Sequence, residues 1–415
     1  MTIEEKAVPE LFSDGFLADP FPTYNHLREN DPVVRIDYPG HRLSVWFITR
    51  YEDVRAAFVD PRFCKDRTTL GSDCPLASTA HHDPELVALT RCLNMVDDPE
   101  HTRLRRLVST GFTPRRVKQM ETEARAYANK LIDAVVADGR MDLVANLANP
   151  LSFDIIGGMI GGLPDEEGRG FDRVRLRELG QRLTTPINGT TPLEYNEIKH
   201  EIKRLTLDLI ERRRGSDGGD SFSAFVQANE RGEITDDELL AMIVTLVVGG
   251  MDTTASFIAT AFHSLLTNPE QLKVLREQPE LMESAVEELL RYAGGMQMAS
   301  FHYTKEEVEI GGVTIPRGEV VAFVLFAANR DPEQFENPDQ LDLNRPDNSH
   351  LGFGLGMHNC LGQKLGRMLT TVAIETVLER IGDFQLAVPA DQVHWRPGAL
   401  LRAPHELPVV FTAKS

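Results

Sequence analysis

The sequence predicts a mainly α-helical protein with a small β part. Helical apolar periodicity dominates residues 98–292 and 360–380, whereas strand-like patterns are confined to about 33–49, 301–324 and 384–413. Of the 415 residues, 41% are hydrophobic and 26% are charged, which is ordinary for a globular protein with a large core.

The first β-rich part is a predicted hairpin. Two apolar-rich runs, at 33–36 and 43–48, are split by Pro39-Gly40, a dipeptide that favours a turn. The second β-rich part alternates over 301–324 with a turn at Gly311-Gly312, and the third lies near the C-terminus.

One predicted helix is much longer than the others. Thr235-Asp236-Asp237-Glu238 has the form of a capping box, and the helix that it opens should last until Asn268-Pro269. That is about 32 residues, or ~48 Å. Because the helix is apolar nearly all round, we expect it to run through the centre of the protein. Another helix is expected over about 279–292.

Charge and cysteine content exclude several classes of protein. The net charge of -19 argues against nucleic-acid or anionic-membrane binding. The longest apolar run, 239–251, is too short for a bilayer span of about 20 residues. The N-terminus has no apolar signal core, and four cysteines without framework spacing indicate a cytoplasmic protein.

The segment that carries chemistry is a glycine-rich loop around Cys360. It reads Phe353-Gly-Leu-Gly-Met-His-Asn-Cys360-Leu-Gly and runs directly into a helical pattern. A helix start should direct N–H groups and a positive dipole end at the sulfur and so lower its pKa. A lone cysteine is more often an inert buried residue. The loop is a poor match to a dinucleotide motif, and no Cys-x-x-Cys pair indicates zinc.

The loop resembles the haem-binding loop of the cytochrome P450 superfamily at six positions: Phe353, Gly354, Gly356, His358, Cys360 and Gly362. Other segments similar to the family follow in the same order along nearly the whole chain. The resemblance implies a soluble, bacterial-type P450 fold formed by residues 1–415 as a single domain, with the long central helix over haem b. It also implies that Cys360 is the axial iron ligand through its thiolate.

The central helix is interrupted by Gly249-Gly250-Met251-Asp252-Thr253. Two glycines and a carboxylate inside an apolar helix are unfavourable, and such violations concentrate at functional sites. The segment resembles the family's acid–alcohol pair, which implies that Gly249 leaves room for a ligand and that Asp252 and Thr253 manage protons and dioxygen. The structural alternative is a kinked helix in which Thr253 bonds back to its own carbonyl.

Further matches to the family assign supporting roles. Glu288-x-x-Arg291, with Arg345, resembles its buried structural ion network. His101 and Arg105, four residues apart on one predicted helix, and His358 match its haem propionate contacts. His302 stands where many relatives have arginine, so we expect a propionate donor that titrates near pH ~6.5. Each of these residues is also compatible with an ordinary surface position.

The resemblance implies a monooxygenase that takes two electrons from ferredoxin and ferredoxin reductase. We expect it to hydroxylate or epoxidise a mainly apolar small molecule of secondary metabolism. Adaptable, Met-rich or apolar positions are the substrate-contact candidates, with plain core packing as the alternative: Val244, Val248, Gly295, Met296, Met298 and Leu400. Basic residues flanking the loop would attract an acidic ferredoxin: Arg103, Arg106, Arg115, Arg116, Lys364 and Arg367. Alternatives are a peroxygenase, an oxidative-coupling enzyme and a non-catalytic haem sensor.

Overall fold

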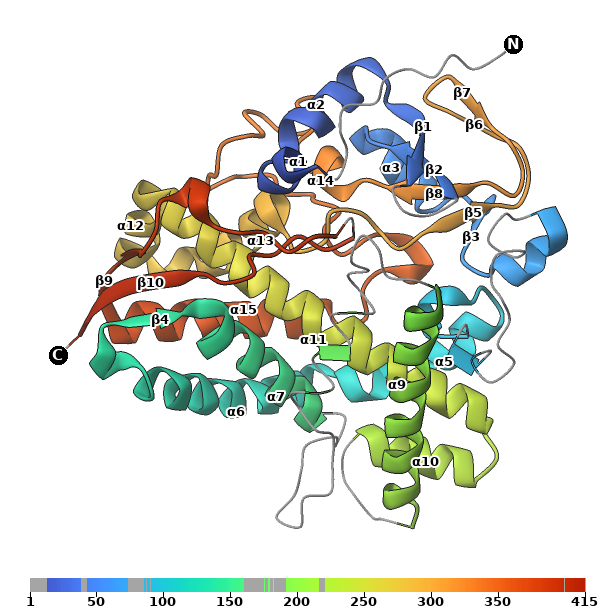
Figure 1. Ribbon diagram of the computed structural model, residues 1–415, viewed down its shortest axis with the longest axis horizontal. Coiled ribbons are helices and arrows are strands. Elements are labelled where there is room, and N and C mark those ends of the chain that lie inside the picture. Colours follow the sequence, from blue (N-terminus) through green and yellow to red (C-terminus); the bar gives the residue numbers. More distant parts are fainter. Residues whose placement is uncertain are drawn as a thin grey trace.

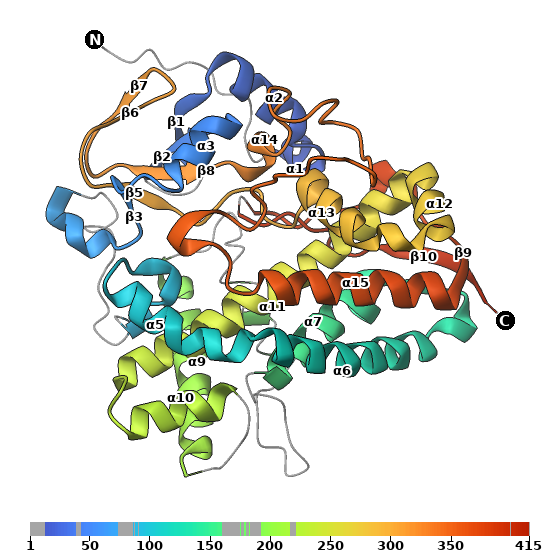
Figure 2. The same cartoon turned by 180° about the vertical axis from the view of Figure 1, so that it is seen from behind.

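A computed structural model of the chain shows a helical body with a β-rich part at one end (Figure 1). The structure describes residues 13–38, 43–73, 86, 88–89, 91–159, 175, 178–179, 182, 192–215, 221–398 and 400–414. The long helix α11, Asp236–Thr267, crosses the middle of the molecule, and the helical body surrounds it on several sides (Figures 1 and 2).

The β-rich end is built on a five-stranded sheet in the order β1-β2-β8-β5-β3. Its strands are β1 (Val33–Tyr38), β2 (Leu43–Ile48), β3 (Phe63–Cys64), β5 (His302–Thr304) and β8 (Val320–Phe323). Strands β1 and β2 pair antiparallel from Val33↔Ile48 to Tyr38↔Leu43, which confirms the predicted hairpin. The β2–β8 pair is parallel and joins segments more than 270 positions apart in sequence.

Strand β2 is buried on both faces, which explains why its sequence is apolar almost throughout. Val45 and Phe47 pack into one hydrophobic cluster with Val320, while Trp46 and Ile48 pack into another on the opposite face. Because successive side chains of a strand point to opposite faces, β2 lies between two parts of the core and contributes to both.

The long central helix was predicted correctly. It has 32 residues, and its capping box is formed: Thr235 Oγ1 accepts from the N–H of Glu238, and Glu238 accepts from the N–H of Thr235. By length and composition α11 could cross a membrane, but 76% of its most apolar window is buried within the fold, as in the core helix of a soluble protein.

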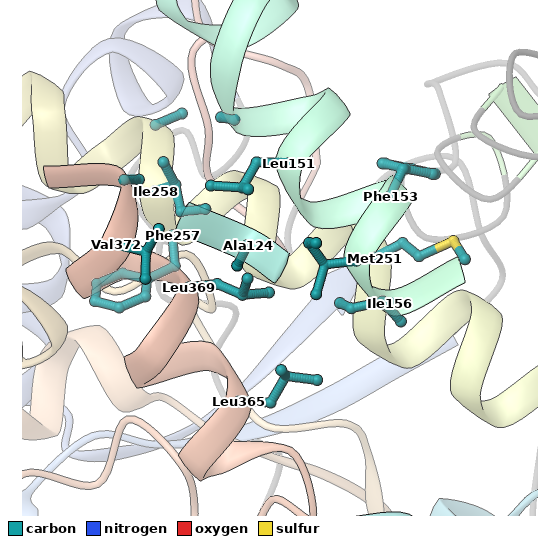
Figure 3. Packing of buried hydrophobic residues seen from close by; sticks show 14 of the residues in the cluster. Ala124, Leu151, Phe153, Ile156, Met251, Phe257, Ile258, Leu365, Leu369 and Val372 are labelled. Atoms are coloured by element: carbon teal, nitrogen blue, oxygen red, sulfur yellow. The ribbon is translucent and has the colours of Figure 1, made fainter. Parts of the chain in front are cut away.

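The helices α7 (Asn149–Met159) and α15 (Gln363–Arg380) pack against α11 in the core (Figure 3). Leu151, Phe153 and Ile156 of α7 lie beside Met251 and Ile258 of α11, and the side chains of α15 close the cluster from another side. Figure 2 shows α15 running alongside α6 (Pro114–Asp133), with both helices in front of α11 in this view. The other helices of this body are α5 (Glu100–Ser109), α9 (Pro192–Arg213), α10 (Ser221–Glu230), α12 (Pro269–Glu277) and α13 (Met282–Ala293).

Smaller elements complete the description. The predicted helix over 279–292 is a short 3₁₀ turn, Pro279–Leu281, followed by α13. The C-terminal β part consists of β9 (Ile381–Leu386) and β10 (Pro408–Ala413), and β10 pairs with both β9 and β4 (Arg140–Asp142). The others are α1 (Asp14–Ala18), α2 (Phe21–Asn30), α3 (Tyr51–Ala57), β6 (Val308–Ile310), β7 (Val313–Ile315) and α14 (Leu325–Ala328).

Candidate haem site

The loop before α15 has a fixed shape that depends on two glycines. Gly354 and Gly356 have φ values of 66° and 73°, in the left-handed region that glycine alone adopts freely. A Cβ on Gly356 would lie 2.8 Å from the carbonyl oxygen of Phe58. The N–H of Cys360 donates to the carbonyl of Phe353 at 2.8 Å, which closes the loop.

The Cys360 side chain is exposed, yet protein surrounds it closely enough to influence its charge. Burial raises the pKa of its thiol, while the N–H of Gly362 and the cations Arg105 and Arg367 act in the opposite direction. The predicted net lowering of the pKa was therefore wrong for the chain alone. α15 begins only at Gln363, and the desolvation around the sulfur outweighs its favourable contacts.

The middle of α11 is open on one side. Gly249 is exposed although it lies inside a helix that is mostly buried, and a Cβ there would meet nothing within 4 Å. At Gly250, in contrast, an added Cβ would lie 3.3 Å from the Ile156 side chain of α7. Thr253 Oγ1 donates to the carbonyl of Gly249 at 2.7 Å. The back-bonded conformation considered as the structural alternative is thus present, and it leaves the oxygen of Thr253 available as an acceptor.

Asp252 is 2% exposed and has a partner that the sequence did not indicate. Its two carboxylate oxygens accept from Nη1 and Nη2 of Arg396 at 2.8 and 2.9 Å, in a bidentate ion pair. Arg396 lies on a C-terminal ribbon in which its N–H donates to the carbonyl of Ala403. The spacing of about 144 residues between the two partners explains why no sequence pattern revealed the pair.

Two predicted propionate contacts lie side by side. The rings of His101 and His358 are 4.3 Å apart, and His101 is 1% exposed. Burial, reinforced by the charges of His358 and Arg105, lowers the pKa of His101 to about 4. Both ring nitrogens of His101 are buried without a hydrogen-bond partner among the described residues, whereas Nε2 of His358 lies 3.6 Å from Oδ1 of Asp97. Arg105 instead donates to the carbonyl of Met357 and to Asn359 Oδ1, which fastens α5 to the Cys360 loop.

His302 lies nearby on β5 and is 5% exposed. Its ring stacks on Phe323 at 4.0 Å and meets Phe58 edge-on. Burial, together with the positive charges of Lys65 and His358, lowers its pKa well below the ordinary value. The expected titration near pH 6.5 is therefore wrong for the protein chain, because that expectation assumed a solvated imidazole.

Glu288, Arg291 and Arg345 come together in the interior. Glu288 and Arg291 of α13 form a bidentate pair with both distances at 2.8 Å, and Arg345 Nε donates to Glu288 at 3.0 Å. The same carboxylate also accepts from Asn348 and from the N–H of Asp342, which sequence reasoning did not identify. The network thereby fixes the segment that precedes the Cys360 loop.

The substrate-contact candidates fall into different environments. Met296 and Leu400 are half-buried, and the segments that carry them pair through the Met296↔Leu401 bridge. Val244 and Met298 are 4% and 1% exposed and pack in hydrophobic clusters, which leaves them almost no surface for a ligand. Gly295 packs its α-carbon against α11, where a Cβ would lie 3.0 Å from Ser256 and Phe257. The side chain of Val248 lies outside the described residues.

These observations agree with an iron porphyrin as the ligand. A thiolate-ligated haem needs an accessible cysteine sulfur, an unobstructed surface opposite it and polar partners for two carboxylates. Cys360 provides the sulfur and Gly249 the open helix surface. The unpartnered, buried nitrogens of His101 need a hydrogen-bonding ligand, which a propionate would provide.

Comparison with known proteins identifies the class. Residues 181–404 match the family model described as Cytochrome P450. The chain is 38% identical over 405 residues to Nocardicin C N-oxygenase from Nocardia uniformis subsp. tsuyamanensis, covering 96% of this chain and 98% of the relative. It is 39% identical over 391 residues to Mycinamicin IV hydroxylase/epoxidase from Micromonospora griseorubida, covering 94% of both chains.

The solved structures agree. A myxobacterial cytochrome P450 in complex with myristic acid superimposes with a TM-score of 0.91 at 33% identity, covering 98% of this chain and 99% of that one. The protein is thus a haem-dependent monooxygenase with the predicted P450 fold and haem b as its cofactor. The chain belongs to the cytochrome P450 family.

Proposed function

We propose that this monooxygenase uses dioxygen and two electrons from a ferredoxin system to hydroxylate or epoxidise a mainly apolar small molecule. Relatives support secondary metabolism as the setting, since they include a 6-deoxyerythronolide B hydroxylase and a mycinamicin hydroxylase/epoxidase. A cytoplasmic location is part of the same proposal. The observation that carries it is the exposed Cys360 sulfur in a loop held by Gly354 and Gly356.

Haem bound to Cys360 would supply the iron that binds and activates dioxygen. The role of the loop is to hold the sulfur still, since the Cys360 N–H is already bonded to Phe353. Arg367 lies over the Phe353 ring at 4.5 Å and steadies that side chain. His101 and His358 would donate to the propionates, and neutral His302 would add a third donor.

Asp252 and Thr253 would handle protons on the opposite side. Thr253 Oγ1 can accept a hydrogen bond while it donates to Gly249, so it can order a water or a polar ligand atom. Both oxygens of Asp252 are occupied by Arg396. Movement of Arg396 would change the hydrogen bonds of this carboxylate, which makes Arg396 part of the proposed proton-handling site.

The ferredoxin would bind over the Cys360 loop. Among the six basic residues predicted for this role, Arg103 is ion-paired with Glu238 and Arg367 with Glu287. Arg106, Arg115 and Lys364 are exposed. Leu355 and Met357, 37% and 39% exposed, add apolar surface on the loop itself.

Charge reversal at Lys364 should raise the KM for an acidic ferredoxin at low salt and have little effect at high salt.

The decisive experiment is the spectrum of the reduced, carbon monoxide-bound protein. Thiolate ligation gives a characteristic long-wavelength Soret band, and Cys360→His should abolish it while retaining haem. Product formed under ¹⁸O₂ with a surrogate ferredoxin and reductase should contain one labelled oxygen. Turnover with peroxide alone, at the same rate and without dioxygen, would instead establish a peroxygenase.

A further inference from the structure

Lys65 is a buried lysine whose position follows from strand register. Strands β3 and β5 pair antiparallel with Phe63 opposite Thr304 and Cys64 opposite Tyr303. Continuing this register by one residue places Lys65 opposite His302. The side chain is 5% exposed, whereas lysines are seldom buried.

The ammonium group of Lys65 is surrounded by neutral acceptors. Nζ lies 2.5 Å from the carbonyl of Ser300, 2.9 Å from Ser300 Oγ, 3.1 Å from the carbonyl of Phe301 and 3.3 Å from His302 Nδ1. Within the part of the chain that the structure describes, no carboxylate oxygen lies within 4 Å of this nitrogen. The Asp97 carboxylate acts on the Lys65 ammonium only through a longer-range attraction. The oxygens of Asp97 accept hydrogen bonds from the backbone N–H groups of Lys65 and Asp66.

A buried charge of this kind is costly without a counter-ion. Burial lowers the pKa of Lys65 to about 7, with Asp97 offsetting only part of the effect. An anion bound close to Lys65 would compensate the charge. The imidazole of His302, whose Nδ1 lies 3.3 Å from Nζ of Lys65, could donate a hydrogen bond to such an anion.

The contact with Lys65 also selects the tautomer of His302. An ammonium has three donors and no acceptor, so Nδ1 must accept and the single proton of the neutral ring resides on Nε2. Stacking on Phe323 and the edge contact with Phe58 restrict the ring in this orientation. His302 therefore presents a fixed N–H donor on the side opposite Lys65.

We propose that Lys65 is a positioning residue for the cofactor: it fixes His302 as an Nε2–H donor to a haem propionate and supplies the positive charge behind that donor. This inference rests on the proposed propionate role of His302. The lysine that directly follows the neighbouring strand β3 would thus supply a positive charge that the neutral histidine itself lacks.

Haem transfer from the holoenzyme to excess apomyoglobin tests the charge. Loss of one charge-assisted contact should make Lys65→Met release haem about tenfold faster than wild type. Lys65→Arg, which keeps the charge and donors, should stay within about threefold. Lys305→Met is the matched control, because Lys305 is an exposed lysine near the same cluster. Equal haem loss from Lys65→Met and the control would overturn the proposal.

The tautomer is tested independently in the wild-type protein, so the outcome does not depend on a variant that folds poorly. In the diamagnetic, carbon monoxide-bound holoenzyme, ¹⁵N shifts should show His302 as neutral with the proton on Nε2, and a proton on Nδ1 would refute the inference. In a His302→Gln background, whose amide donates without tautomer selection, the effect of Lys65→Met should shrink. Failure of the thiolate spectrum, rather than of these readouts, would contradict the proposed function itself.

Discussion

At the residue scale, the ion pair between Asp252 and Arg396 distinguishes this site from an isolated carboxylate on a helix. We predict that Arg396→Gln lowers the free energy of unfolding by about 2–4 kcal/mol, because it leaves a buried carboxylate uncompensated. The double variant with Asp252→Asn should recover part of the loss, since the remaining groups are neutral. Urea titrations of the wild type, the two single variants and the double variant, followed by circular dichroism, measure the coupling free energy between the two side chains. Additive losses would show that the two side chains do not stabilise each other.

The loop glycines allow a second residue-scale prediction. Gly356 and Gly232 have similar φ values, 73° and 74°. A Cβ added to Gly356 would have neighbouring atoms within 4 Å, whereas a Cβ added to Gly232 would have none. Gly232→Ala should therefore cost about 1–2 kcal/mol from backbone strain alone. Gly356→Ala should cost more and should also speed haem loss, because the loop must move away from Phe58. Equal stability losses and unchanged haem retention would contradict this account.

At the element scale, α13 and α15 are joined by Glu287. Its carboxylate accepts from Arg367 at 2.5 and 2.8 Å and contacts His350 at 3.1 Å. Although burial alone would raise its pKa, hydrogen bonds and charge from Arg367 and His350 hold the pKa at about 2. Because this value lies below the ordinary 4.5, the resulting stabilisation is complete above about pH 4.5 and is lost as pH falls toward 2.

Glu287→Gln should accordingly reduce the unfolding free energy by about 1–2 kcal/mol at pH 7, with the difference from wild type shrinking as pH falls below about 4.5. Urea titrations between pH 7 and pH 3 provide the measurement. Glu283→Gln, an exposed carboxylate on the same helix, is the control and should show no such pH-dependent difference. A constant difference at every pH would refute the assignment.

At the scale of the whole molecule, the Glu288–Arg291–Arg345 network connects α13 to the chain that leads into the Cys360 loop. Glu288 and Arg291 are 0% and 1% exposed, and Arg291 also donates to the carbonyls of Asn329 and Pro338. Arg291→Met should lower the free energy of unfolding by about 3–5 kcal/mol and reduce haem incorporation together with it. Arg55→Met, in an exposed pair with Glu52, should change neither quantity measurably. Normal haem content in a strongly destabilised Arg291 variant would show that the network does not support the Cys360 loop.

The sequence was sufficient for features that depend on neighbouring residues. The capping box and apolar run specified the central helix, the split apolar runs specified the β1–β2 hairpin, and the spaced glycines around Cys360 indicated the haem loop. In each case the relevant interactions are local, so their pattern is visible within a few positions of the chain.

Only the tertiary structure decided what depends on distant partners. The pairing of Asp252 with Arg396 and the burial of Lys65 against His302 have no local signal, because desolvation is set by elements that meet only after folding. The same reason explains the corrected pKa expectations for Cys360 and His302. Sequence determined which groups this protein has for its chemistry, and tertiary packing determined which of them are charged, paired or open to a ligand.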